Sequence, residues 1–267
     1  MKIEHGDVTL NVEISGPEQA QPLLMAHSLG CDHRMWAPQV AALQPQFRLI
    51  QLDMRGHGLS SVTDQPFSLD DLADDVIAVM DALNLQQAHW LGLSIGGMIG
   101  QSLLLRHPQR IQQAMLCDTA AALPDGAGAV WQQRIDQVQQ HGLGSIMSTT
   151  LERWFTPAFL EAENTDAAVA AALRGIREQL STTTDAGYCA CSHAITGLNY
   201  LPELHRVKHT VALVVGAEDQ STPVAASEQI AAVIEGSTLS VLEQASHIAN
   251  VEQASAFNRL VLDFFTS

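Results

Sequence analysis

The chain has 267 residues, 46% of them hydrophobic, and a formal net charge of −16 at pH 7. This length and composition can bury a large core, and single α/β domains reach this size. With 13 Lys and Arg against 29 Asp and Glu, no basic stripe is available for nucleic acid or anionic lipid, so we expect neither partner.

The N-terminus lacks the charged and apolar regions of a signal peptide, and no apolar run approaches the ~20 residues of a membrane span. We therefore expect a cytoplasmic protein that does not enter a membrane. The four cysteines are too few for a disulfide scaffold, and the Cys189-x-Cys191 pair lacks the second half of a zinc site. The sequence predicts buried free thiols and no bound metal.

The first 120 residues alternate between strand and helix patterns. Residues 8–14 have a period of two, which predicts a half-buried antiparallel edge strand. Apolar runs that predict core strands occupy residues 23–26, 47–53, 88–91 and 113–118. Apolar residues at helical spacing occur in residues 35–43, 72–83 and 98–105. Ser68 and Asp71 fit a capping box that starts the second of these helices. The alternation predicts an α/β fold, a mostly parallel doubly wound sheet with helices on both faces.

The pattern changes between about residues 120 and 206, where apolar strand runs are absent. Helical periodicity occurs instead in residues 130–138, 144–155, 167–180 and 186–195. Alternation resumes with a strand at 211–215, a helix at 224–234, a strand at 239–242 and a helix at 251–265. We expect a core domain of residues 1–120 and 207–267, with residues 121–206 inserted as a helical cap or lid.

The pentapeptide Gly92-Leu93-Ser94-Ile95-Gly96 ends one predicted strand and opens the next helix. In the G-x-S-x-G pattern the serine occupies a sharp, strained turn that exposes its hydroxyl at the edge of the sheet. Small residues two positions before and after the serine are required because side chains there would clash. Ser94 is therefore the candidate nucleophile.

A serine hydroxyl needs a base to take its proton during attack, and that base is usually a histidine. On this fold the chain order is nucleophile, acid, histidine, with the acid just past a late strand. Asp219 follows the apolar run 211–215, and His247 is the only histidine beyond it. We expect Asp219 to orient the His247 ring and His247 to act as the base.

Two alternatives to a catalytic Asp219 stay open. Asp219 would also suit the start of a helix ahead of Pro223, with Ser221 or Thr222 as its cap. Asp118 is the reserve acid, because it too ends a predicted strand. The neighbouring Glu218 is expected to point away from the site.

An acyl-transfer site also needs two backbone N–H groups that bind the developing oxyanion. The Ile95 N–H, directly after the nucleophile, is one candidate. The second is expected from the loop at residues 27–30, where we favour the Leu29 N–H over that of Ser28. His27 is expected to hold this loop by hydrogen bonding, and His57 to shape a turn.

Several motifs together resemble the α/β-hydrolase fold superfamily. They are His27-Ser28-Leu29-Gly30, Met35-Trp36-Ala37-Pro38-Gln39, Arg55-Gly56-His57-Gly58, the segment 92–97 and Ala245-Ser246-His247. A narrower resemblance, to 3-oxoadipate enol-lactonases, rests on residues 28–30 with the Met-Trp segment and on residues 116–120, 153–156, 188–195 and 246–250.

The narrower resemblance implies a cofactor-free serine hydrolase that opens a small enol-lactone bearing a carboxylate, in the β-ketoadipate pathway of aromatic catabolism. Ser94 separates the chain from similar dehalogenases and epoxide hydrolases, which carry Asp at this turn, and from dienelactone hydrolases, which carry Cys. The alternatives are a general small-molecule carboxylesterase, a cofactor-free oxygenase or perhydrolase, and a receptor that keeps the site for binding. The oligomeric state stays open.

A substrate carboxylate in so acidic a protein requires a local arginine. Arg134 lies three residues after Trp131 on one predicted helix face, and Arg153 adjoins Trp154. We expect Trp131, Arg134 and Trp154 to bind substrate, with Arg153 a weaker candidate; the alternative is a surface arginine beside a packing tryptophan. Trp36 is expected either to line the pocket or to pack beneath the 27–30 loop.

Overall fold

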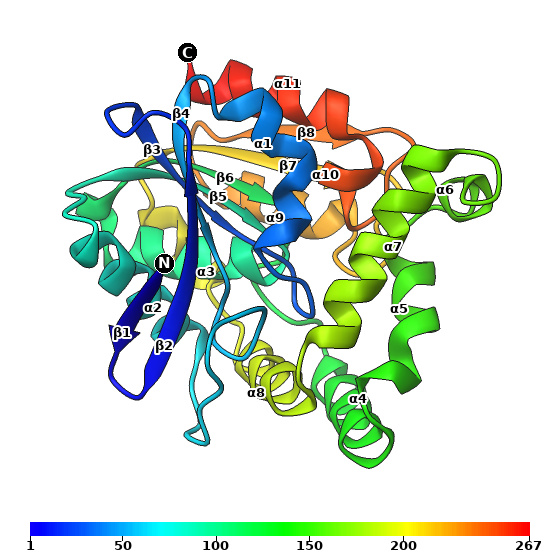
Figure 1. Cartoon of the computed structure of the whole chain (residues 1–267). Helices are drawn as coiled ribbons and strands as arrows, with labels where there is room; N and C mark the ends of the chain where they lie inside the picture. The colour runs from blue at the N-terminus through cyan, green and yellow to red at the C-terminus, as the bar shows by residue number, and fades with distance from the viewer.

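The computed structural model describes residues 1–267 and is built on an eight-stranded sheet with the order β1-β2-β4-β3-β5-β6-β7-β8 (Figure 1). The strands are β1 Lys2–His5, β2 Val8–Ser15, β3 Gln21–Ala26, β4 Phe47–Leu52, β5 Ala88–Leu93, β6 Ile111–Cys117, β7 Thr210–Gly216 and β8 Thr238–Leu242. The pairs β1–β2 and β2–β4 are antiparallel, and all other pairs are parallel. The predicted mostly parallel sheet is confirmed.

The prediction of an edge strand at residues 8–14 is wrong. The strand exists as β2, but it pairs with β4 on one side and with β1 on the other, so β1 is the edge. β1 has only four residues, and Lys2 and Glu4 on it are exposed. A strand this short and polar carries too little alternation to be recognised in sequence.

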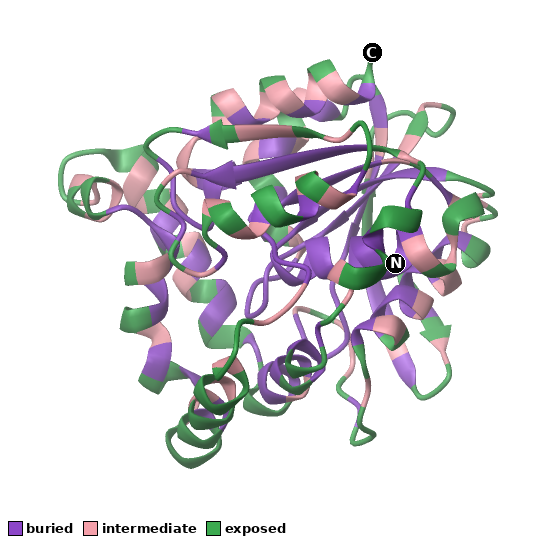
Figure 2. Ribbon diagram, turned by 180° about the vertical axis from the view of Figure 1, so that it is seen from behind, coloured by how far each residue is buried: buried purple, intermediate pink, exposed green.

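Side chains from the central strands divide between two cores, one on each face of the sheet. Leu24 and Ala26 belong to a core that also holds residues of α2 (Leu69–Ala82), α3 (Ile95–Arg106) and α9 (Val224–Val233). Leu23 and Met25 pack with α1 (Ala37–Leu43) and α11 (Ala254–Phe265) on the opposite face. Both faces are covered, and the strands are buried between outer helices that expose their far sides (Figure 2). This burial explains why the strands are continuous apolar runs.

The predicted capping box at Ser68 is present. The Asp71 N–H donates to Ser68 Oγ at 3.2 Å, and the Ser68 N–H donates to Asp71 Oδ2 at 2.7 Å, which starts α2 at Leu69. The predicted last helix is divided into α10 (Ala249–Glu252) and α11.

Five helices lie between β6 and β7 and gather to one side of the sheet (Figure 1). They are α4 Ala127–His141, α5 Met147–Trp154, α6 Pro157–Ala162, α7 Ala167–Thr182 and α8 Asp185–Thr196. We refer to α4–α8 as the insertion. Four of them match predicted helical patterns, whereas α6 was missed because six residues are too few for a periodicity. The insertion closely contacts the core: a Cβ on Gly187 of α8 would lie 2.1 Å from the Gly56 carbonyl oxygen.

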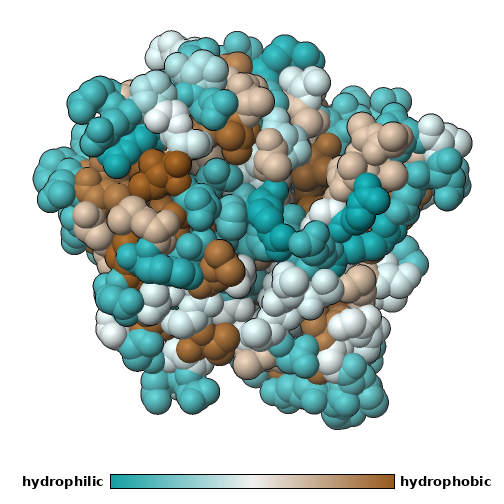
Figure 3. Space-filling view, viewed as in Figure 1, coloured by the Kyte–Doolittle hydropathy of each residue, from teal (hydrophilic) through white to brown (hydrophobic).

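All four cysteines are free and buried, as predicted. No helix combines the length and apolar character that crossing a membrane would need. The face seen in Figure 3 is largely hydrophilic, with apolar residues in separate patches, in keeping with the acidic composition.

Candidate active site

Ser94 lies on a strained turn between β5 and α3. Its backbone has φ 60° and ψ −117°, a conformation that residues with side chains rarely adopt. The flanking glycines permit the turn: a Cβ on Gly92 would lie 2.2 Å from the Gly96 carbonyl oxygen, and one on Gly96 would lie 2.3 Å from the Ala26 carbonyl oxygen. Strain held in place by such close packing is typical of functional residues.

His247 and Asp219 continue from Ser94 in one hydrogen-bonded series. His247 Nε2 lies 2.9 Å from Ser94 Oγ, and His247 Nδ1 lies 2.8 Å from Asp219 Oδ2. The carboxylate assigns a proton to Nδ1, so Nε2 is free to accept from the serine hydroxyl. The three residues follow β5, β7 and β8, whose carboxyl ends meet at one edge of the parallel sheet.

The Asp219 carboxylate is fully buried and fully hydrogen-bonded. Oδ1 accepts from the backbone N–H groups of Ser221 at 2.7 Å and Thr222 at 3.0 Å, and Oδ2 accepts from the Thr222 hydroxyl at 2.8 Å. Burial opposes ionisation, but attraction to His247 and these hydrogen bonds outweigh it and lower the pKa of Asp219. The alternative role for Asp219 is wrong as stated: α9 has Pro223 as its N-cap and no side-chain cap, so neither Ser221 nor Thr222 caps it, and Asp219 instead holds the loop before the helix. The hydrogen bond from the Thr222 hydroxyl to Asp219 was missed because its sequence position indicates only a helix cap.

The reserve acid Asp118 does not contact His247. It is fully buried; Oδ1 accepts from the Gly216 N–H at 2.8 Å, and Oδ2 has no hydrogen-bond partner. Burial and the nearby Asp219 charge raise the pKa of Asp118 well above its usual value. Asp118 is therefore a buried carboxyl group that lies behind the site and forms no hydrogen bond with His247.

The loop at residues 27–30 is held by two buried histidines: His27, as predicted, and His57, which was expected only to shape a turn. His27 Nδ1–H donates to the Ser28 carbonyl at 2.8 Å, and His27 Nε2 accepts from the Met54 N–H at 3.1 Å. His57 Nε2 accepts from the Gly30 N–H at 2.9 Å. In a trans peptide the Leu29 N–H points away from the Ser28 carbonyl, so these bonds orient that N–H as well.

His57 contributes to the pH dependence of stability. Burial lowers the pKa of His57 to about 3, so between about pH 6.5 and that value the unfolded chain binds a proton that the folded chain does not. Lowering the pH from about 7 to about 5 is expected to reduce the free energy of unfolding by about 2 kcal/mol through this group. Urea titrations at both pH values measure the free energy of unfolding. In His57→Gln, the decrease in the free energy of unfolding between the two pH values should be smaller by about 2 kcal/mol. An equal drop in both proteins would contradict the assignment.

A cavity of about 470 Å³ opens over Ser94 and His247. Of the substrate-binding candidates, Trp131, Arg134, Arg153 and Trp154 line it, together with Leu29 of the 27–30 loop. The Trp154 ring centroid lies 6.3 Å from that of His247. The cavity is thus closed on one side by the insertion and on the other by the ends of the strands.

Arg134 is half-buried in the cavity wall, and its hydrogen-bond partners are neutral. Its Nε–H donates to the Tyr188 hydroxyl, and its Nη2–H donates to Thr150 Oγ1 at 2.6 Å. Burial raises the pKa of Tyr188 even though Arg134 opposes that shift, so the phenol stays neutral. The guanidinium charge is therefore held without a carboxylate. Tyr188 was missed as a pocket residue because helical spacing does not show which face meets a cavity.

The expectation that Trp36 lines the pocket is wrong. Its side chain is fully buried and lies among the core residues between α1 and α11, with its ring centroid 6.2 Å from that of Phe257. Trp36 ends a short 3₁₀ helix just before α1, so it packs that helix against the C-terminal one. Trp36 is a core residue.

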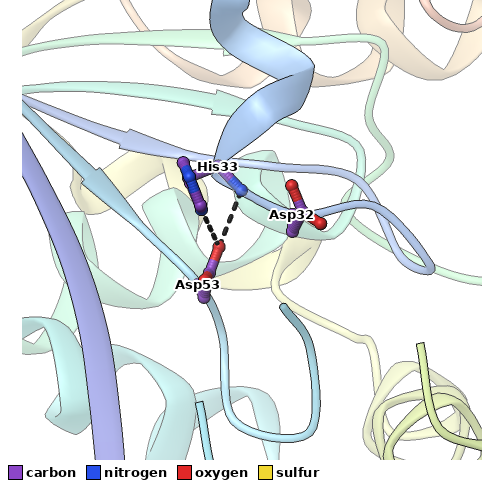
Figure 4. A group of neighbouring side chains, drawn as sticks. All are labelled: Asp32, His33 and Asp53. Atoms are coloured by element: carbon purple, nitrogen blue, oxygen red, sulfur yellow. Dashed lines mark hydrogen bonds and ion pairs between the residues drawn. The ribbon is translucent and has the colours of Figure 1, made fainter. Parts of the chain in front are cut away.

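Asp32, His33 and Asp53 lie close enough together to offer ligand atoms to one ion (Figure 4). Asp53 Oδ1 already accepts from the His33 N–H at 2.7 Å and from His33 Nδ1–H at 2.8 Å, and Asp32 pairs with Arg34 at 2.7 Å. Burial opposes ionisation of Asp53, but His33 and other donors more than offset it, so the pKa of Asp53 is lowered. None of the three lines the cavity, and their bonds hold the 3₁₀ helix His33–Trp36, which precedes α1, against the residue that follows β4.

Comparisons with known proteins show which family the chain belongs to. The family described as "alpha/beta hydrolase fold" matches residues 21–254. The chain belongs to the α/β-hydrolase fold family. It is 38% identical to 3-oxoadipate enol-lactonase 2 of Acinetobacter baylyi over 96% of this chain and 92% of that protein, and 32% identical to enol-lactonase 1 of the same organism over 97% and 94%. The crystal structure of the enol-lactonase from Burkholderia xenovorans LB400 superposes with a TM-score of 0.92 at 35% identity, covering 97% of each chain. This α/β-hydrolase is an enzyme that hydrolyses ester or lactone bonds.

Proposed function

We propose that the enzyme opens a small enol-lactone that bears a carboxylate, 3-oxoadipate enol-lactone, to give 3-oxoadipate. The observation that carries this proposal is the Ser94–His247–Asp219 series beneath a cavity whose wall holds Arg134 without an acidic partner. The enol-lactonase relatives support the same substrate. We further propose residues 121–206 as a cap that shapes the substrate pocket over the core domain.

The reaction proceeds through an acyl-enzyme. Ser94 Oγ attacks the lactone carbonyl while His247 Nε2 takes its proton, and Asp219 stabilises the imidazolium that forms. The ring C–O bond then breaks, and the proton on Nε2 passes to the leaving enol oxygen. Water, activated by His247, hydrolyses the ester to Ser94 in the second half-reaction. The enol oxygen is a good leaving group, so the first step needs no metal.

Two backbone donors are proposed to bind the oxyanion. The Leu29 N–H donates to no acceptor within the protein and lies in the cavity wall. The Ile95 N–H is at the first residue of α3, where a helix leaves its N–H groups without partners. The bond from His27 to the Ser28 carbonyl supports Leu29 rather than Ser28 as the second donor.

Arg134 is proposed to bind the substrate carboxylate. An ion pair in a partly closed cavity is worth about 1.5 to 3 kcal/mol, so Arg134→Ala should lower kcat/KM for the carboxylate-bearing lactone by about 10- to 100-fold. A neutral ester such as p-nitrophenyl acetate should lose only a few-fold. Steady-state kinetics on both substrates measures the difference.

Arg174→Ala is the matched control, because Arg174 lies exposed on α7 outside the cavity. It should leave both substrates unaffected. Equal losses on the lactone and the neutral ester in Arg134→Ala would show that Arg134 does not bind the carboxylate. Better turnover of neutral esters by the native enzyme would instead favour a general carboxylesterase.

A further inference from the structure

Glu252 is a partly buried carboxylate of α10 that the proposed reaction does not use. Its Oε2 accepts from the Ser246 N–H at 2.9 Å, directly beside His247 in the chain. Its Oε1 accepts from the Thr156 N–H at 3.0 Å and also from the Thr156 hydroxyl. One carboxylate therefore joins the loop of the histidine to the segment between α5 and α6 of the insertion.

Two further hydrogen bonds join the loop of His247 to the end of α5. The Ser246 hydroxyl donates to the Arg153 carbonyl at 3.0 Å, and the Ile248 N–H donates to the Trp154 carbonyl at 3.1 Å. Arg153 and Trp154 are wall residues of the substrate cavity. His247 thus lies in one of the two segments that Glu252 joins, and the wall residues Arg153 and Trp154 lie in the other.

We propose that Glu252 is a positioning residue: its carboxylate sets the placement of His247 relative to Ser94 and that of the Arg153–Trp154 wall relative to His247. This inference rests on the proposed function, because it assumes that His247 is the base. The physical argument is that a carboxylate offers acceptors only, and three donors from two segments point at it. Ser246 and Thr156 are themselves buried, so loss of one acceptor leaves a buried N–H unpaired, and the loop that carries His247 must then shift.

Glu252→Gln tests this with almost no change in size. The glutamine oxygen can still accept from one segment, but its NH₂ group then faces a donor of the other. A displacement of His247 by a fraction of an ångström should lower kcat by about 10- to 100-fold. KM for p-nitrophenyl acetate should rise as the Trp154 wall moves. Glu243→Gln is the control, since Glu243 is exposed in the same region and its substitution removes the same charge.

The readout must separate positioning from loss of fold. The burst of p-nitrophenol on acylation counts functional sites, and kcat is then expressed per site. We expect a near-complete burst count but a lowered kcat per site in Glu252→Gln, and wild-type values in Glu243→Gln. Normal kcat per site with fewer functional sites would overturn the proposal, because it would show a purely structural role. Thr156→Val, which removes one donor, should lower kcat per site in the same direction but less.

The pH profile is a second readout. Burial raises the pKa of Glu252, with help from Glu218, while Thr156 and Ser246 oppose the shift; the buried Asp118 carboxyl also lies nearby. Protonation of the Glu252 carboxylate turns one of its acceptor oxygens into a donor, and the glutamine substitution likewise replaces an acceptor with a donor. The kcat of the native enzyme divided by that of Glu252→Gln should therefore fall towards one as the pH is lowered. A constant ratio would count against the proposal. If His247→Ala retained full activity, the proposed function would fail instead, and the two failures are thereby distinguishable.

Discussion

Ser94→Ala is expected to lower kcat for p-nitrophenyl acetate hydrolysis by about a millionfold. The alanine removes the only atom that can form the acyl-enzyme, while the turn that carries it stays held by Gly92 and Gly96. His247 Nε2, 2.9 Å from the Ser94 oxygen, would then have no proton to accept. Steady-state rates and the loss of the p-nitrophenol burst measure the effect.

Ser255→Ala is a suitable control, because Ser255 is exposed on α11 and forms no side-chain hydrogen bond. Its kcat should equal that of the native enzyme. Unchanged turnover in Ser94→Ala would show that another group is the nucleophile. Residual turnover about 10³- to 10⁴-fold above the rate in water would be consistent with the proposed oxyanion donors acting alone.

Asp219→Asn is expected to lower kcat by about 10⁴-fold with little change in KM. An amide at this position can donate to His247 Nδ1, which would move the histidine proton to Nε2 and leave Ser94 without a base. The bonds from the Ser221 and Thr222 N–H groups to Oδ1 keep the side chain in place, so the geometry should survive. The rate and the pH profile of kcat measure the loss.

Asp118→Asn provides the contrast. Asp118 lies outside the hydrogen-bonded series, and its Oδ1 accepts from the Gly216 N–H as an amide oxygen can, so an amide of the same shape should leave kcat within a few-fold of native. If instead Asp219→Asn retained most of its activity and Asp118→Asn lost it, the acid would be Asp118. The two substitutions therefore decide between the acids that the sequence left open.

The parts of the site that depend on local backbone geometry could be predicted from the sequence. Gly92 and Gly96 around Ser94 reveal the strained turn, because only glycine fits there. The order of strands along the chain then predicts Asp219 and His247 as the partners of Ser94. In the structure His247 is hydrogen-bonded to Ser94 and Asp219 is hydrogen-bonded to His247. The capping box of α2 is local in the same way.

Other assignments depend on which surfaces meet. Trp131 and Trp36 have similar sequence contexts, beside predicted helices, yet one lines the cavity and the other is in the core. Helical spacing shows that residues share a face but not what the face contacts. The edge position of β1 was hidden for a related reason, since pairing partners of a strand are set by the whole sheet.

The amino-acid sequence by itself determined the doubly wound fold, the turn that presents Ser94 and the order of its partners. The fold and the turn depend on the spacing of residues close together in the chain, and the order of the partners depends on the chain order of the strands. Only the tertiary structure decided that Arg134 faces the cavity with Tyr188, that Asp118 stays apart from His247, and that Glu252 joins the histidine loop to the insertion. These contacts link segments far apart in the chain, and long-range packing leaves no periodic signal in sequence.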